Sequence, residues 1–201
     1  MVGPSPMDAA HSLGQAGPPA LKQQGSAAGR LINDHEAAVR QAPDTSAPMR
    51  TVERTVPIDW TDYNGHLNEA RYLDCFSIAT DAMMRLVGVD ADYLAAGSSY
   101  FTVETHIRHL DEVTAGNEIY ATSQLLMGEG KKMQLFHHLY AADADGKGRL
   151  LATGEHMLIH VDMNSRSSSL PSDAVAAKLA ELAAAHEKLP RPEGAGRAIG
   201  G

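Results

Sequence analysis

From residue 51 onward, apolar and polar residues follow two different periods, which predict a short strand and then a long helix. Residues 51–58 (TVERTVPI) alternate as a strand does. Between His66 and Val87 polar residues recur every three or four positions, which is typical of a helix with one broad apolar side, and Gly88 should end it. The apolar side is expected to carry Leu67, Ala70, Leu73, Phe76, Ala79, Met83 and Leu86.

Four further strand-like runs follow a short helical piece at 90–97. They are 99–110, 117–127, 132–142 and 149–161. The last two gaps, GEGK and DADGKG, have the length and glycine content of hairpin loops, so the strands beside them should be antiparallel neighbours. One long helix against a single antiparallel sheet of about five strands is an α+β arrangement.

The segments outside this region differ in composition. Residues 1–50 are rich in Gly, Pro, Ala, Ser and Gln, which predicts a disordered or weakly helical amino-terminal segment. A polar linker is expected over 164–172, an alanine-rich helix over 173–189 and a flexible tail over 190–201. The predicted domain therefore occupies residues 51–163.

Composition and charge narrow the classes of function. The chain has 201 residues and a formal net charge of -8, with no cluster of Lys and Arg of the kind that binds nucleic acid. Cys75 is the single cysteine, so no intrachain disulfide can form and a reducing, cytoplasmic location is expected. No apolar run approaches the roughly 20 residues that cross a bilayer, so no membrane partner is expected.

The segment WTDYNGHLNEARYL (60–73), before the long helix, combines several polar and turn-forming residues. The amino end of a helix carries unpaired N–H groups and a partial positive charge, so it can hold an oxygen anion. Gly65 permits close approach to a ligand, and Asn64 and Asn68 can cap the helix or hold a polar substrate. Asp62 would then face the bound oxygen, which suits acyl hydrolysis. Alternatively, Asp62 and Asn64 are only turn and cap residues.

The run DYNGHLNEARYL resembles the D-x-x-G-H-x-N-x-x-x-Y signature of hotdog-fold acyl-CoA thioesterases of the 4-hydroxybenzoyl-CoA thioesterase type. The matching residues are Asp62, Gly65, His66, Asn68 and Tyr72. The predicted β-α-ββββ order is that of a hotdog domain, and the resemblance covers roughly 50–163. Glu69 stands where many relatives have a second Asn, so the contact made by that Asn is open here.

Three further stretches, WTDYNGH, YLAAGSSYFTVETHIRHL and LFHHL, are similar to the betainyl-CoA thioesterase branch of carnitine degradation. The resemblance implies that Asp62 is the catalytic carboxylate and that backbone N–H groups near Gly65 and His66 polarise the thioester carbonyl. It also implies an acyl-CoA substrate, a homodimer or homotetramer, and no metal or redox cofactor. Whether the carboxylate attacks directly or deprotonates water stays open.

A trimethylammonium acyl group calls for aromatic faces with a carboxylate nearby. Trp60 and Tyr63 flank Asp62, and Glu104 is expected on the same strand face as Tyr100. The alternative for Trp60 is simple packing beside the helix start. The substrate-binding candidates are Asn64, Asn68, Tyr72, Trp60, Tyr63, Tyr100 and Glu104.

Ten histidines suggest a metal site, but their spacing does not support one. His156 and His160 would share a strand face about 13 Å apart, too far for one zinc ion. Cys75 lies in the apolar side of the helix, where a free cysteine acts as a small hydrophobe.

Two other functions fit parts of the sequence. A hotdog enoyl-CoA hydratase would use Asp62 and His66 as acid and base, although Gly65 stands where that pattern has a proline. A non-catalytic acyl-CoA-binding module would need no carboxylate beside a helix start.

Overall fold

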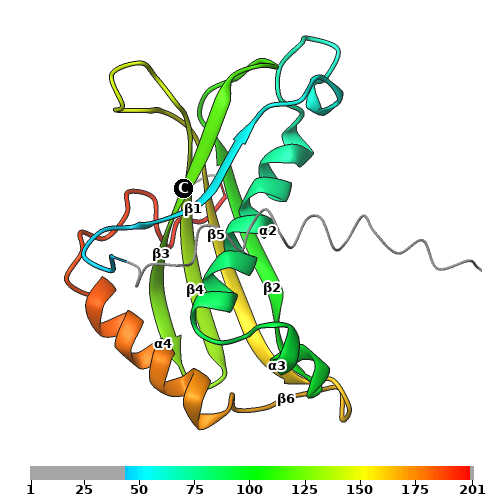
Figure 1. The fold of residues 1–201 in the computed structure, drawn as a ribbon, viewed down its shortest axis with the longest axis vertical. Helices are drawn as coiled ribbons and strands as arrows, with labels where there is room; N and C mark the ends of the chain where they lie inside the picture. Colours follow the sequence, from blue (N-terminus) through cyan, green and yellow to red (C-terminus); the bar gives the residue numbers. More distant parts are fainter. Residues whose placement is uncertain (1–43, 200–201) are drawn as a thin grey trace, which may run out of the picture. The chain divides into compact units, whose positions relative to one another are not determined.

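A curved antiparallel sheet and one long helix make up most of residues 44–199, the part of the chain that the computed structural model describes (Figure 1). The amino-terminal segment was expected to be disordered or weakly helical over residues 1–50, and its residues 1–43 lie outside the described part of the chain. The elements are β1 (Met49–Thr55), η2 (Ile58–Trp60), α2 (Glu69–Leu86), α3 (Ala91–Ala95), β2 (Ser98–His109), β3 (Glu118–Glu129), β4 (Lys132–Ala141), β5 (Arg149–Asp162), β6 (Ser167–Ser168) and α4 (Asp173–His186).

The strand order is β1-β3-β4-β5-β2, and β6 pairs with the end of β5. Both predicted hairpins are confirmed, because β3 pairs with β4 and β4 with β5, each antiparallel. Strands β1 and β2 form the two edges, and their places could not be read from loop lengths. The α+β hotdog arrangement of one long helix on an antiparallel sheet is confirmed.

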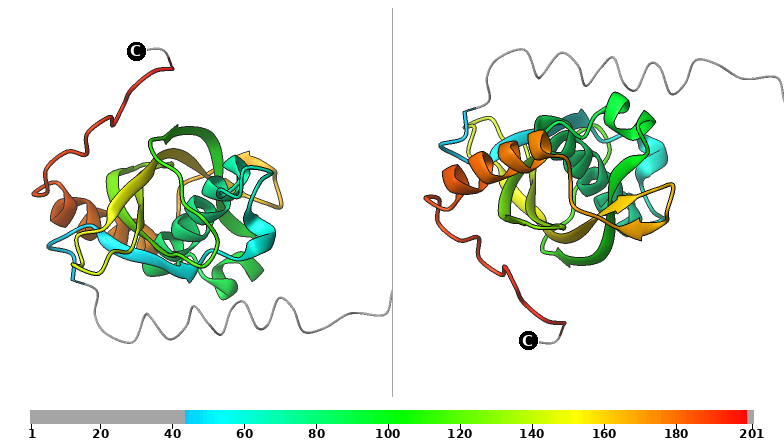
Figure 2. Two further views of the ribbon diagram at one scale, coloured as in Figure 1. Left: turned by 90° about the horizontal axis from the view of Figure 1, so that it is seen from above. Right: turned by 90° about the horizontal axis from the view of Figure 1, so that it is seen from below.

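Helix α2 lies in the hollow of the sheet, and views along the helix show the strands curving around it (Figure 2). The side chains that it buries are Tyr72, Cys75, Phe76, Ala79, Thr80 and Met83. The buried side is thus rotated from the predicted one, and Ala70 and Leu73 are exposed. Phe76 fixes the packing distance, since a Cβ on Gly154 of β5 would lie 2.7 Å from its ring. Burial raises the pKa of the Cys75 thiol to about 12, so this thiol stays protonated.

A β-bulge in β2 corrects one prediction. Thr102 pairs with Leu158, but Glu104 pairs with the next residue of β5, Met157. The extra residue between them reverses the alternation of side chains, as bulges do. Glu104 therefore lies on the face opposite to Tyr100, and the expected aromatic and acidic pair does not form.

A chain of polar side chains crosses the core between the sheet and α2, and we call it the histidine network. Thr51 Oγ1 lies 2.7 Å from Ser123 Oγ, which lies 2.7 Å from His137 Nδ1. His137 Nε2 lies 3.1 Å from Thr80 Oγ1, and that oxygen lies 3.4 Å from His156 Nδ1. Burial lowers the pKa of His137 and lowers that of His156 to about 4, so both rings are neutral near pH 7.

Helix α4 lies along the part of β3 that β1 leaves unpaired (Figure 1). The pairing of β1 with β3 ends at Ser123. Two residues later, the Leu125 N–H donates to His186 Nδ1 at 2.8 Å. A side chain from α4 therefore satisfies a strand-edge donor that would otherwise lack a partner.

The segment after α4, expected to be a flexible tail, is hydrogen bonded to the outer face of the sheet. Gln124 Nε2 donates to Pro190 O at 3.4 Å, and Gly196 N–H donates to Glu155 Oε2 at 2.7 Å. Phe136 pairs with both Gln124 and Glu155, and its side chain is only 1% exposed. We infer that this segment covers Phe136, an apolar side chain on the face away from α2.

Candidate active site

The acidic segment before α2 forms a closed loop, residues 61–68, which we call the Asp62 loop. Trp60 O accepts a hydrogen bond from Asn68 N–H at 2.9 Å, and Asp62 N–H donates to His66 O at 2.8 Å. Leu67 N–H donates to Val113 O at 2.7 Å, which ties the loop to the connection between β2 and β3. The loop therefore has a fixed position between the sheet and the start of α2.

The two carboxylate oxygens of Asp62 have different surroundings. Oδ1 accepts hydrogen bonds from Asn64 N–H at 2.8 Å and from His66 N–H at 3.3 Å. Oδ2 takes no part in the hydrogen bonds of the loop, and the residue is partly exposed. The turn thus holds one oxygen and leaves the other outside its hydrogen bonds, so the turn and catalytic interpretations of Asp62 do not exclude each other.

The two amides predicted to polarise a thioester carbonyl, those of Gly65 and His66, already have hydrogen-bond partners. Gly65 N–H donates to Asp62 O at 3.0 Å, and His66 N–H is used by the Asp62 carboxylate. Helix α2 starts only at Glu69, with Asn68 as its N-cap accepting from Ala70 N–H at 3.0 Å. The Gly65 and His66 amides are therefore engaged inside the loop. The backbone still explains why a glycine stands at position 65, since its φ of 79° lies in the left-handed region that favours glycine.

Trp60 has a different partner from the predicted trimethylammonium group. The guanidinium carbon of Arg54 in β1 lies 3.7 Å from the centroid of the Trp60 ring. The corresponding atom of Arg71 in α2 lies 5.2 Å from it. Two cations already lie within 5.2 Å of the centroid of this indole, which makes it an unfavourable place for a third.

The other predicted substrate residues are not gathered around Asp62. Tyr63 is 96% exposed, whereas Tyr100 is buried with its ring edge-on to His160. Tyr72 is buried, and its hydroxyl donates to Asp111 O at 3.1 Å. Asn64 is exposed, and its backbone N–H rather than its side chain bonds to Asp62. Of these predicted substrate residues, Tyr63, Asn64 and Asn68 belong to the loop that contains Asp62, and Tyr72 and Tyr100 do not.

Sequence reasoning missed the residues that brace the loop. Arg149 of β5 pairs with Asp111 and donates to Glu112 O at 3.1 Å, holding the connection that anchors Leu67. The Arg149 side chain holds the pKa of the Asp111 carboxyl below its ordinary value. Arg149 has no local signal, because it lies 38 residues from Asp111. The signal for Arg54 was equally weak, an arginine in an alternating strand.

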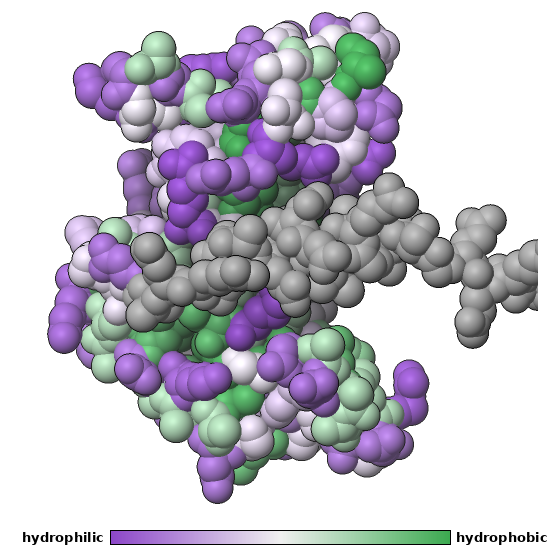
Figure 3. All heavy atoms as spheres, viewed as in Figure 1, coloured by the Kyte–Doolittle hydropathy of each residue, from purple (hydrophilic) through white to green (hydrophobic). Residues whose placement is uncertain are grey.

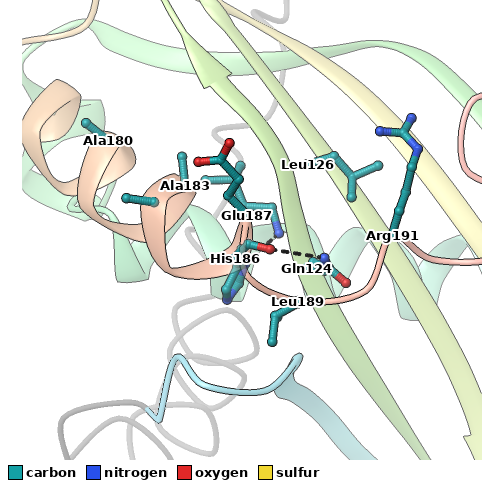
Figure 4. Close-up of a pocket in the computed structure, with 10 residues that line it drawn as sticks. Gln124, Leu126, Ala180, Ala183, His186, Glu187, Leu189 and Arg191 are labelled. Atoms are coloured by element: carbon teal, nitrogen blue, oxygen red, sulfur yellow. Dashed lines mark hydrogen bonds between the residues drawn. The ribbon is translucent and has the colours of Figure 1, made fainter.

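A separate cavity of about 480 Å³ lies between α4 and β3 (Figure 4). It is lined by Gln124, Leu125, Leu126, Ala180, Ala183, Ala184, His186, Glu187, Leu189 and Arg191. None of the predicted site residues lines it, so it carries no support for the acyl-hydrolysis site.

No cluster of three or more His, Cys, Asp or Glu side chains suited to a metal ion occurs among residues 44–199. His160 instead lies 2.8 Å from the Tyr93 hydroxyl, and His156 belongs to the histidine network.

No helix in the same part of the chain is long and apolar enough to span a membrane. The face drawn in Figure 3 is largely hydrophilic, with smaller apolar areas between.

The sequence profile of the thioesterase-like superfamily matches residues 56–179. This segment contains the Asp62 loop, α2 and strands β2 to β5. The chain belongs to the thioesterase-like superfamily. This superfamily member is 48% identical, over 187 residues, to L-carnitine dehydrogenase/betainyl-CoA thioesterase of Ruegeria pomeroyi, covering 90% of this chain and 37% of that protein. It thus spans little more than a third of that relative's length.

A shorter relative is matched almost throughout. The betainyl-CoA thioesterase of Pseudomonas aeruginosa is 42% identical over 156 residues, covering 77% of this chain and 96% of that protein. Among solved structures, a proposed thioesterase from Pseudomonas putida KT2440 has a TM-score of 0.65 and 37% identity, covering 76% of this chain and 96% of its own. A Staphylococcus aureus protein solved in complex with CoA has a TM-score of 0.68 at 23% identity, which shows the fold alone.

Proposed function

We propose that this protein hydrolyses betainyl-CoA to glycine betaine and CoA, with Asp62 as the catalytic carboxylate. The observation that carries the proposal is the Asp62 carboxylate itself, with Oδ1 held by two backbone N–H groups and Oδ2 left out of the loop's hydrogen bonds. The relatives that carry the betainyl-CoA thioesterase name, at 42% and 48% identity, support the substrate.

The held carboxylate suits two hydrolytic routes. Oδ2 can attack the thioester carbonyl carbon and form an anhydride that water then opens, or it can take a proton from a water molecule that attacks instead. In both routes the C–S bond breaks, the sulfur leaves as the CoA thiol after gaining a proton, and the oxygen of water ends in the carboxylate product. The two routes remain alternatives for Asp62.

We propose that the N–H group that donates to the thioester oxygen lies at the start of α2. The N–H groups of Gly65 and His66 are not assigned this role. Glu69 N–H is the first amide of the helix, and it makes no hydrogen bond to the backbone of residues 44–199. The Asn68 side chain caps Ala70 N–H and leaves the Glu69 amide available. A donor at a helix start also gains from the helix dipole as the oxygen becomes negative.

The proposal includes a homodimer or homotetramer in the cytoplasm, acting without a metal or redox cofactor. Strand β2 is a sheet edge whose Phe101 and Val103 side chains are 53% and 60% exposed. An exposed edge strand with apolar side chains is a template for pairing with a second chain. Tyr63, almost fully exposed beside Asp62, is the aromatic residue we expect such a partner to enclose around the acyl group.

A thiol-release assay over betainyl-CoA, acetyl-CoA, 4-hydroxybenzoyl-CoA and a short enoyl-CoA tests the proposal. We expect the highest kcat/KM for betainyl-CoA, with release of one thiol per ester consumed. Loss of enoyl absorbance without thiol release would assign a hydratase instead. Tight binding of all four esters without turnover would assign a non-catalytic module.

A further inference from the structure

Two guanidinium groups from different elements lie close to the indole of Trp60. Arg54 of β1 stacks at 3.7 Å from the ring centroid, and Arg71 of α2 lies at 5.2 Å. Arg54 Nε is buried and has no hydrogen-bond partner among the described residues. Because Arg54 Nε has no such partner, we attribute the position of the guanidinium to its cation–π contact with the ring, a contact that lysine cannot reproduce in full.

The backbone of Trp60 forms the neck of the Asp62 loop. Its N–H donates to Pro57 O at 3.1 Å, and its carbonyl accepts from Asn68 N–H at 2.9 Å. Asn68 is also the N-cap of α2. The ring contact with Arg54 therefore fixes, through one residue, both the closing hydrogen bond of the loop and the start of the helix.

We propose that Arg54 and Trp60 are positioning residues, which hold Asp62 Oδ2 and the first amide of α2 at the separation that the reaction requires. This inference rests on the proposed thioester hydrolysis. It assigns the Trp60 ring to the protein's own cation and leaves the trimethylammonium group to other side chains. Loss of the stack then lowers kcat for all acyl groups alike and changes KM little.

Strand β1 offers a matched control. Arg50, four residues before Arg54, lies with its guanidinium carbon 4.0 Å from the centroid of the Tyr120 ring, away from the Asp62 loop. Arg50→Met and Arg54→Met thus each remove one cation–π contact from the same strand. Only the second contact reaches the loop.

The kinetic test compares these two variants on betainyl-CoA and acetyl-CoA. We expect Arg54→Met to lower kcat about 10- to 100-fold on both esters, in line with the effect of a displacement of about 1 Å at a reacting group. Arg54→Lys should recover part of this loss, and Arg50→Met should keep the wild-type kcat. A wild-type kcat for Arg54→Met, or a rise in KM confined to betainyl-CoA, would overturn the inference.

A second readout does not depend on turnover, because Trp60 is the only tryptophan in the chain. Arg54→Met should make Trp60 fluorescence more accessible to acrylamide and should speed hydrogen exchange at Asn68 N–H about tenfold or more, while Arg50→Met changes neither. If the wild type hydrolyses none of the esters, the proposed function fails but this measurement still tests the stack. Unchanged quenching and exchange in a folded Arg54→Met protein would refute the stack even if the wild type is active.

Discussion

The Asp62 loop and the histidine network both concentrate polar groups, and they treat those groups in opposite ways. In the loop, Asp62 Oδ1 is bonded to two amides of its own turn while Oδ2 stays outside the loop's bonds at a partly exposed position. In the network, His137 is fully buried and both of its ring nitrogens have hydroxyl partners.

This difference shows how polar residues serve catalysis and folding differently. A catalytic carboxylate needs a fixed orientation together with a free oxygen, so part of its bonding capacity must stay unused. The buried His137 imidazole has both nitrogens hydrogen bonded, whereas His156 Nε2 in the same network is buried with no hydrogen-bond partner among the described residues; an unpaired polar atom in the core costs stability. Removing Asp62 should therefore cost activity, and removing His137 should cost stability.

The largest expected effect is the loss of turnover on substitution of Asp62, in the Asp62 loop. Asp62→Asn should lower turnover of betainyl-CoA by about 10²- to 10⁴-fold, the usual contribution of a positioned acid or base. The fold should not change, because the amide oxygen can still accept from Asn64 and His66 N–H. Thiol release and thermal melting measure the two results, and Asp59→Asn, an exposed acid in η2, is the control. Near-wild-type turnover would remove Asp62 from the mechanism.

His137→Ala should give the opposite result. It leaves a cavity and removes one of the two partners of each of the Ser123 and Thr80 hydroxyls, which together should cost about 3 kcal/mol of unfolding free energy. The kcat of the folded protein should stay near that of the wild type. Urea unfolding measures the loss, with His138→Ala on the opposite strand face as the control. Equal losses in both variants would show that the network has no special weight.

Acid should weaken the histidine network, because burial lowers the pKa of both of its imidazoles. The folded pKa of His156 is lowered to about 4, below an unfolded value of about 6.5, so the unfolded chain takes up a proton first as the pH falls. The contribution of His156 to the free energy of unfolding is present above about pH 6.5, and this free energy should fall by roughly 3 kcal/mol between pH 6.5 and pH 4. His137, with its pKa lowered in the same direction, adds to this loss. Urea unfolding at pH 7 and pH 5 measures this loss of stability. Equal free energies of unfolding at the two pH values would show that His137 and His156 are not held neutral by burial.

The smallest effect is expected from the carboxy-terminal segment. Deleting residues 190–201 should uncover Phe136 and cost about 2 kcal/mol, close to the value of one buried aromatic side chain. Turnover should not change, since this segment contacts the outer face of the sheet. Deleting only residues 198–201 is the control, because it keeps the bond from Gly196 to Glu155. A large loss of turnover in the longer deletion would connect this face to the active site.

Much of the fold and the turn at Asp62 could be predicted from the sequence. Asp62 bonds to residues two and four positions away, so its turn is encoded within a few residues. The hairpins at 128–131 and 143–148 are marked by glycines in the same local way. The Glu104 prediction was wrong because a bulge in β2 changes the side-chain alternation without a clear local signal.

The sequence alone determined the five long strands, the two hairpins, the long helix and the polar loop before it, because each depends on residues close together in the chain, whereas β6 lies in the segment predicted to be a linker. Only the tertiary structure decided that Arg54 covers Trp60, that Thr51 reaches a serine 72 residues away, and that Gly196 reaches Glu155. These contacts depend on strand order, register and the rotation of α2. Those are set by the packing of the whole core, in which every element constrains the others at once.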